Sequence, residues 1–313
     1  MTVPEERHLT SDEILEVLHF IGFPLEQADK LPAPTLETLT EFQYRAMTTI
    51  PFETLSLRLT KERHVDITLD GILDRVLRQR RGGWCFSLNR LCYEVLRGLG
   101  FKAQWVIARV CKPLKYGDPL VYGPPTHRTT LVLIEDKENN GGSVTTTFTK
   151  YLVDIGFGAS PYKPIELREG AEVEYFGHRR RMSKVVHNQA NTETLGNPVE
   201  EMWRLEEWMG RGRWGPCYAF TESQAYEVDA EMSNWYTCHS PNSFCSSRFW
   251  VMKGTADGKY LLLMQNDFKI RSANGTEFAM TCKTEKEREH VLEKYFNIHL
   301  TDEERECNDQ KLP

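Results

Sequence analysis

Cys85 is the side chain in this sequence that is best placed to act as a nucleophile. It stands in RQRRGGWCFSLNRL, residues 78–91, where two glycines and a tryptophan lead into a helical pattern. The reactive form of cysteine is the thiolate, which the free N–H groups of a helix start and nearby arginines favour. The glycines also let the backbone approach a substrate closely. The alternative is a cysteine that fills a core gap after glycines that end a helix, and this segment alone leaves both interpretations open.

A nucleophilic cysteine needs a base, and His127 is the histidine in the most suitable position. It lies in GPPTHRTTLVL, residues 123–133, where Pro124 and Pro125 stiffen a loop that runs into a strand pattern. A side chain at such a junction can face a cleft. Most of the other histidines fit surface or core positions, and His239 is the hardest of them to dismiss.

The imidazole in turn needs an orienting acid, and Asp154 is the candidate. It stands within the apolar strand pattern YLVDIGFG, residues 151–158, where an acid is costly unless it is paired. The alternative is an aspartate that starts the turn before Gly156. Together Cys85, His127 and Asp154 predict a triad in which the acid orients the base and the base activates the thiol.

The elements that must hold these residues change in type along the chain. Apolar residues recur at helical spacing up to about residue 102, with Ser11 and Thr35 as expected caps and one helix starting at Cys85. Short runs of β-branched and aromatic residues follow to about residue 220, and a mixed α/β pattern closes the chain. Its last long helix is expected after Thr284, which has capping-box spacing to Glu287. Two polar stretches, 136–150 and 174–201, are expected to be loops.

Composition limits the classes of protein that the chain can belong to. The 313 residues, 40% of them hydrophobic, predict a globular protein of more than one domain. A formal charge of -6 argues against a general nucleic-acid or anionic-membrane binder. The N-terminal MTVPEERHLT lacks a secretory pattern, and no apolar run approaches the ~20 residues of a membrane span, so we expect a cytoplasmic protein. The eight cysteines show no zinc-binding spacing and are expected to be reduced, so no metal site is predicted.

The motifs together resemble the arylamine N-acetyltransferase family. RGGWCFSLN, PPTHRTTLV and VDIGFG occur in the family's order, Cys, His, Asp. IPFETLSLRL, residues 50–59, is similar to the family's PFENL motif, with Thr54 where asparagine is usual. NWYTCHSPNSFCSSRFWV, residues 234–251, resembles the segment that starts the family's third domain. The loops are longer than in compact bacterial members, which makes the chain more similar to fungal-type members.

The resemblance implies an α+β fold with a papain-like Cys-His-Asp site. A helical bundle would occupy residues 1–102 and carry the nucleophile. A β-barrel-like domain, 103–220, would carry the histidine and the aspartate, and an α/β lid would follow over 221–313. Cys85 would be the acylated nucleophile, His127 the general base and Asp154 its orienting acid.

The resemblance also implies the substrates. Acetyl-CoA would acylate Cys85, and an arylamine or hydrazine would then take the acyl group in a ping-pong reaction, with no permanently bound cofactor and no metal. Phe86 and Phe157 would contact the acceptor, and Arg81 would pair with Glu53 to support the site. The residues that bind CoA are unknown: GHRRRMSK, residues 177–184, either neutralises phosphates or is a solvated face. The partners would be these two small molecules only, and the protein a monomer.

The sequence alone leaves other interpretations of the triad open. The donor could be propionyl- or malonyl-CoA instead of acetyl-CoA. Transglutaminases and papain-like proteases use a similar order of side chains, although RGGWCF is unlike the surroundings of either nucleophile. A binding protein that keeps the fold without turnover is the third possibility, and the intact triad argues against it.

Overall fold

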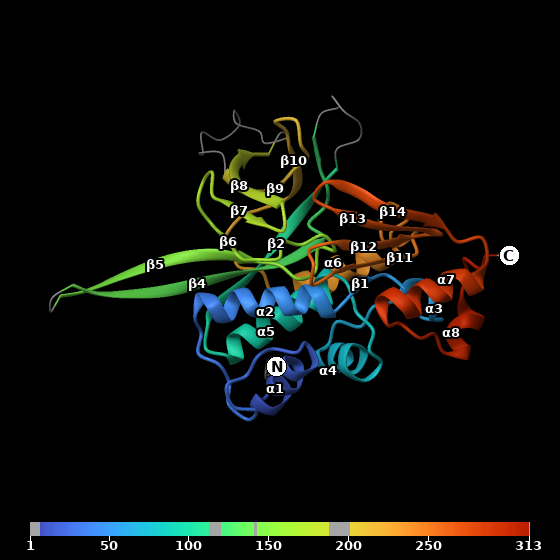
Figure 1. The fold of residues 1–313 in the computed structure, drawn as a ribbon, viewed down its shortest axis with the longest axis horizontal. Coiled ribbons are helices and arrows are strands. Elements are labelled where there is room, and N and C mark those ends of the chain that lie inside the picture. The colour runs from blue at the N-terminus through green and yellow to red at the C-terminus, as the bar shows by residue number, and fades with distance from the viewer. Residues whose placement is uncertain (1–6, 113–119, 141–142, 188–200, 313) are drawn as a thin grey trace.

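The computed structural model describes residues 7–112, 120–140, 143–187 and 201–312. Helices from the first part of the chain lie on one side of two sheets, and helices from its end pack beside the second sheet (Figure 1). The predicted order of a helical, a β-rich and an α/β part is therefore present. Whether residues 1–102, 103–220 and 221–313 are separate domains stays a prediction.

The helices of the first part begin close to the predicted residues. They are α1 (Ser11–Phe20), α2 (Leu36–Thr49), α3 (Ser56–Leu59), α4 (Leu69–Leu73), its wider continuation η1 (Asp74–Arg78) and α5 (Cys85–Gly98). Thr35 caps α2, and α5 starts at Cys85, as predicted. The cap of α1 is Thr10 rather than Ser11, because Thr10 and Glu13 form a reciprocal capping box.

The larger sheet curves into a nearly closed barrel. Its strands are β2 (Lys102–Lys112), β3 (Val121–Tyr122), β4 (His127–Asn140), β5 (Ser143–Val153), β6 (Ile165–Glu166), β7 (Glu172–Tyr175), β8 (His178–Val186), β9 (Glu201–Trp208) and β10 (Trp214–Phe220). The order is β6-β5-β4-β2-β10-β9-β8-β7, with β3 paired to β2. The terminal strand β6 also contacts β7 and β8, which nearly closes the barrel.

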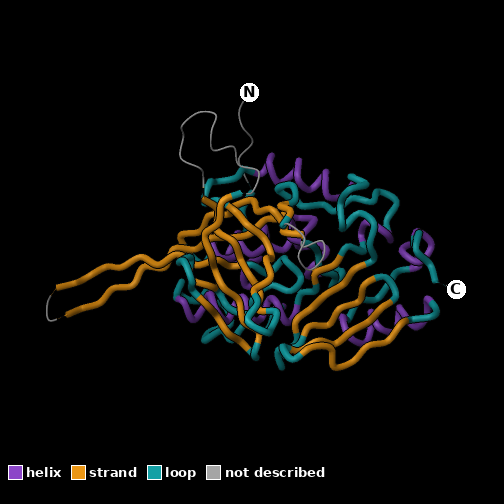
Figure 2. Tube along the Cα trace, turned by 90° about the horizontal axis from the view of Figure 1, so that it is seen from above, coloured by secondary structure: helices purple, strands orange, loops and turns teal. Residues whose placement is uncertain are grey.

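Two segments that were predicted to be loops are largely strands. The stretch 136–150 forms the far part of the antiparallel β4–β5 hairpin, which extends away from the rest of the molecule (Figures 1 and 2). The low hydrophobicity of this stretch indicated a loop, although its run of β-branched threonines suits a two-stranded ribbon. The stretch 174–201 contains β8, which pairs with both β7 and β9. Residues 188–200 of that prediction lie outside the described residues.

The second sheet combines the first and last parts of the chain. It consists of β1 (Phe52–Glu53), β11 (Trp250–Gly254), β12 (Tyr260–Met264), β13 (Asp267–Ser272) and β14 (Gly275–Thr281), all antiparallel neighbours in that order. Helices α7 (Glu285–Val291), its continuation η2 (Leu292–Phe296) and α8 (Asp302–Cys307) follow. Leu55 and Leu59 share their apolar core with Phe249 and Phe296. Thr284 caps α7, as predicted, by accepting from the Glu287 N–H.

Helix α6 (Glu227–His239) joins the helical part to the barrel. Glu227 forms ion pairs of 3.1 Å with Arg90 on α5 and 3.0 Å with Arg128 on β4. The Trp84 indole N–H donates to the Asn234 Oδ1 at 3.0 Å. These contacts hold α6 beside the start of α5. Among the described residues, no helix combines the length and the apolar content that crossing a bilayer requires.

Candidate functional site

The structure brings Cys85, His127 and Asp154 together from three elements. Cys85 is the first residue of α5, His127 is the first residue of β4, and Asp154 follows the last residue of β5. The imidazole Nε2 lies 2.7 Å from Asp154 Oδ2, and the Cys85 thiol lies close enough to the imidazole to raise its pKa. The Cys85 Sγ also lies 3.4 Å from the carbonyl oxygen of Thr126. The three side chains thus lie together in the order thiol, imidazole, carboxylate.

Asp154 is both a buried acid and the start of a turn, so the two sequence interpretations are not exclusive. Strand β5 ends at Val153, and the strand predicted over 151–158 is therefore too long. The carboxylate is 1% exposed, so it depends on hydrogen bonds in place of water. Its donors are His127 and Tyr218 on Oδ2, and Asn89, the Gly156 N–H and Ser160 on Oδ1. Such a set of donors holds the acid ionised and fixed.

The charges of His127 and Asp154 each favour the ionised form of the other residue. Burial alone would lower the pKa of His127, but the charge and hydrogen bond of Asp154, with a smaller effect of Cys85, raise it to about 9. Burial alone would raise the pKa of Asp154, and the charge and hydrogen bond of His127 bring it below its usual value. A carboxylate accepts and cannot donate, so Nε2 carries a proton. Nδ1 is then the ring nitrogen left for the thiol.

Asn89 is a residue of this site whose role the sequence interpretation missed. It lies one turn after Cys85 on α5, and its amide donates to Asp154 Oδ1 at 2.9 Å and to the Arg128 carbonyl. Its Oδ1 accepts from the Ile155 N–H at 3.0 Å. One buried amide thus ties α5 to β4 and to Asp154. The signal in the sequence was a polar residue at i+4 from Cys85 on the apolar stripe of α5.

Aromatic rings cover the imidazole. The ring of Phe157 packs edge-on against His127 with centroids 5.2 Å apart, and the ring of Tyr218 lies 4.6 Å from it. Phe157 is half-buried, so it can face a substrate. Phe86 has no exposed surface and lies in the apolar core together with Trp84 and Cys85. Phe86 therefore exposes no surface that an acceptor could contact, and its predicted role stays a prediction.

Tyr218 is the second residue that the sequence interpretation missed. It lies on β10, and its hydroxyl donates to Asp154 Oδ2 at 2.8 Å. Burial is the main reason that the pKa of Tyr218 is raised well above its usual value, so the group stays a neutral donor. The sequence could not predict its contact with Asp154, because that contact depends on the pairing of β10 with β2 in the barrel.

We expect Tyr218→Phe to lower kcat/KM for acyl transfer about tenfold, because the ring remains while one hydrogen bond to a charged acceptor is lost. Steady-state kinetics with one donor and one acceptor measure the change. Tyr162→Phe is the matched control, since that hydroxyl donates to the Lys259 carbonyl at 2.7 Å and does not touch the acid. Equal losses in the two variants would show that Tyr218 has no special part in holding Asp154.

Comparison with known proteins identifies the group to which this site belongs. The model of the N-acetyltransferase family matches residues 35–305, which include all three residues of the row. The chain belongs to this family. It is thus an acyltransferase that depends on an acyl-CoA, and the resemblance to arylamine N-acetyltransferases is confirmed.

Individual relatives are distant in sequence and similar in fold. The N-malonyltransferase FDB2 of Fusarium pseudograminearum is 29% identical over 295 residues, which cover 87% of this chain and 80% of that protein. The human arylamine N-acetyltransferase 1 is 28% identical and covers 85% of this chain and 88% of its own length. The solved arylamine N-acetyltransferase of Mycobacterium abscessus superposes with a TM-score of 0.77 at 25% identity, covering 98% of this chain and 99% of that one. The α+β fold is confirmed by this match.

The arginines that precede Cys85 support the fold rather than a thiolate. Arg81 lies 3.6 Å from Glu53, the pair predicted from the motifs, and also pairs with Glu304. Arg78 and Arg80 are exposed, and the guanidinium of Arg80 lies 5.7 Å from the centre of the Phe20 ring. The cations that were expected to favour the thiolate thus have other partners, whereas the Cys85 thiol affects the pKa of His127.

The basic run at 177–184 has carboxylate partners within the barrel. Most of it forms β8, where Arg179 pairs with Glu172, Arg180 with Glu207, Arg181 with Glu206 and Lys184 with Glu201. These pairs satisfy the charges that would otherwise attract phosphate groups. The structure therefore favours the structural interpretation of this run over CoA binding.

A cavity of about 480 Å³ lies next to the loop that carries His127. Pro125 lines it, together with Ile107 and Arg109 of β2 and Met232 and Ser233 of α6. Its volume is within the range of small-molecule sites. Ile107 packs against the same core as the start of α5, so the cavity lies on the face of the sheet that packs against α5.

Proposed function

We propose that this enzyme transfers an acyl group from acetyl-CoA to an arylamine or hydrazine through a thioester on Cys85. The observation that carries the proposal is the row of Cys85, His127 and Asp154, in which a fully paired carboxylate holds the imidazole. The same row would serve a hydrolase, and membership of the N-acetyltransferase family favours transfer to an amine.

The first half-reaction follows from the protonation states. The raised pKa of His127 keeps the proton of the pair on the imidazole, and the Cys85 sulfur attacks the thioester carbonyl of the donor. The S–C bond to CoA breaks as the new S–C bond forms, and the imidazolium returns its proton to the leaving thiolate of CoA. Asp154 stabilises the imidazolium throughout without accepting its proton.

The second half-reaction uses the same groups. The neutral amine attacks the acyl carbonyl on Cys85, and His127 removes the amine proton that the new amide bond sets free. The Cys85 sulfur leaves and is reprotonated by the imidazolium. Because CoA departs before the amine reacts, one half-buried site can serve both substrates in turn, with Phe157 beside the imidazole as an apolar wall for an aryl ring.

Malonyl-CoA is the second candidate donor, and two observations favour it. The Fusarium relative is named an N-malonyltransferase. A malonyl group carries a carboxylate, and Arg109 lines the cavity beside the loop of His127, where it donates to the Gly123 carbonyl at 3.2 Å. A guanidinium in that position suits the free carboxylate of a malonyl group.

A donor panel separates the two candidates. We expect acetyl-CoA to support transfer to an arylamine with double-reciprocal plots that are parallel lines, as a ping-pong order requires, and with equal rates in wild type and Arg109→Gln. A malonyl-CoA rate that exceeds the acetyl-CoA rate, and that falls about tenfold or more in Arg109→Gln, would replace the first candidate by the second. Intersecting lines with every donor would contradict the covalent route.

A further inference from the structure

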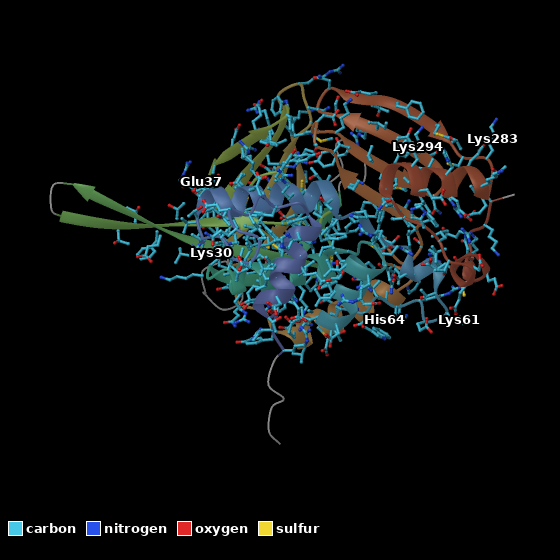
Figure 3. The ribbon with its side chains drawn as sticks, turned by 60° about the horizontal axis from the view of Figure 1, so that its bottom comes forward. Lys30, Glu37, Lys61, His64, Lys283 and Lys294 are labelled. Carbon is cyan, nitrogen blue, oxygen red and sulfur yellow. The ribbon has the colours of Figure 1, made fainter. Side chains whose placement is uncertain are left out.

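A cluster of metal-ligating side chains lies outside the acyl-transfer site. His64 stands in the loop between α3 and α4, and Cys238 and His239 end α6. One ligand atom from each lies within 4.8 Å of the others, and the two imidazoles stack with centroids 5.6 Å apart. Figure 3 shows His64 at the surface of the molecule, where an ion can reach it. We propose that His64, Cys238 and His239 bind a Zn²⁺-type transition-metal ion.

The set of ligands suits such an ion chemically. Imidazole nitrogen and thiolate sulfur are the ligands that zinc and cobalt prefer, at about 2.0–2.1 Å and 2.3 Å. Tetrahedral geometry at those lengths places the two nitrogens and the sulfur roughly 3.3–3.6 Å apart. The cluster must therefore contract by about 1 Å, which the exposed side chains of His64 and His239 can provide by rotating, while the buried Cys238 stays fixed. Three protein ligands leave the fourth position for water.

Zinc and cobalt bind the thiolate form of cysteine, so binding exchanges the Cys238 thiol proton for the metal ion.

The surrounding structure holds the loop of His64 in place. The Asn234 amide, one turn before Cys238, donates to the Val65 carbonyl at 3.0 Å. The same Asn234 accepts from Trp84, the residue that directly precedes Cys85. The loop and α6 are therefore fixed relative to each other before any ion binds, which lowers the cost of ordering the ligands. Metal binding at this cluster is independent of the proposed acyl transfer.

Titration with Co²⁺ tests the proposal, because a cobalt–thiolate bond gives a charge-transfer absorption band. We expect the band to saturate at one Co²⁺ per chain in wild type, to be displaced by Zn²⁺, and to disappear in Cys238→Ser. His64→Gln, a change on an exposed loop that leaves the fold intact, should weaken binding at least tenfold. Circular dichroism and the unfolding midpoint show that each variant is folded.

Two further variants show which thiol binds the ion. Cys85→Ser removes the thiol of the acyl-transfer site, and Cys307→Ser makes the same change at the end of α8. Both should keep the band and the affinity. A band that persists in Cys238→Ser, that is lost in Cys85→Ser, or that is absent from wild type would overturn the proposal.

Discussion

Cys85→Ser is expected to lower kcat/KM for acyl transfer by about 10⁴-fold or more. The serine hydroxyl is far less acidic than a thiol, and an oxygen ester is a poorer relay to an amine than a thioester. His127 and Asp154 keep their positions, since the change is small and the neighbouring Thr126 carbonyl can accept from the new hydroxyl as it does from the thiol. Initial rates with saturating acyl-CoA and an arylamine measure the loss.

Cys92→Ala is the matched control for this variant. Cys92 lies two turns further along α5, has no exposed surface and belongs to the same apolar core. Burial raises the pKa of Cys92 beyond the range in which a thiolate forms, so it acts as a small apolar side chain. Full activity is expected for this control. A Cys85→Ser variant that keeps more than about a tenth of the wild-type rate would exclude Cys85 as the nucleophile.

Asp154→Asn is expected to lower kcat/KM by about 10³- to 10⁴-fold while the protein stays folded. Every partner of the carboxylate is a donor, so the amide NH₂ of asparagine meets donors on either side. Turned toward His127, it forces Nε2 to accept and moves the ring proton to Nδ1, where it faces the thiol. The imidazole then cannot take the thiol proton.

The same variant should change the titration of His127. Its raised pKa of about 9 depends on the Asp154 charge, so without that charge burial dominates and the pKa falls below the usual 6.5. In wild type the ion pair stabilises the fold below pH 6.5, and this stabilisation is lost as pH rises through about 9. Urea unfolding at several pH values should show that loss in wild type and not in Asp154→Asn.

Asp257→Asn is the control for these measurements. Asp257 pairs with Lys259 at 3.1 Å in an exposed turn, away from the row. Its rate and pH profile should match those of wild type. Wild-type activity in Asp154→Asn would mean that another residue orients the imidazole.

The residues of the site could be predicted from the sequence to the extent that each carried its own local signal. Cys85 stood at a helix start, His127 at a loop–strand junction, and Asp154 among apolar neighbours. Tyr218 had no such signal, because its contact with Asp154 depends on β10 crossing to β2 in the barrel. The cluster of His64, Cys238 and His239 was missed for a similar reason. His64 is far from the other two in the chain, whereas zinc-binding sequence motifs are recognised by short spacings between ligands.

The elements of the fold could likewise be predicted where the local sequence carried a clear signal. Helices with a strong apolar stripe and a polar cap, such as α2 and α5, began at the predicted residues. The β4–β5 hairpin was mistaken for a loop because both of its strands are polar there, and only their pairing with each other makes them strands. Strand β8 was missed because its arginines suggested a solvated face, whereas carboxylates of neighbouring strands pair with them.

Peptide mass spectrometry of the acylated enzyme is the most direct test of the central claim. The wild-type protein is incubated with acetyl-, propionyl- or malonyl-CoA in the absence of an amine, then digested and sequenced by fragmentation. We predict one acyl group per chain, located on Cys85 and removed when an arylamine is added. An unmodified Cys85 with all three donors, or an acyl group on another residue that the amine removes, would contradict the account.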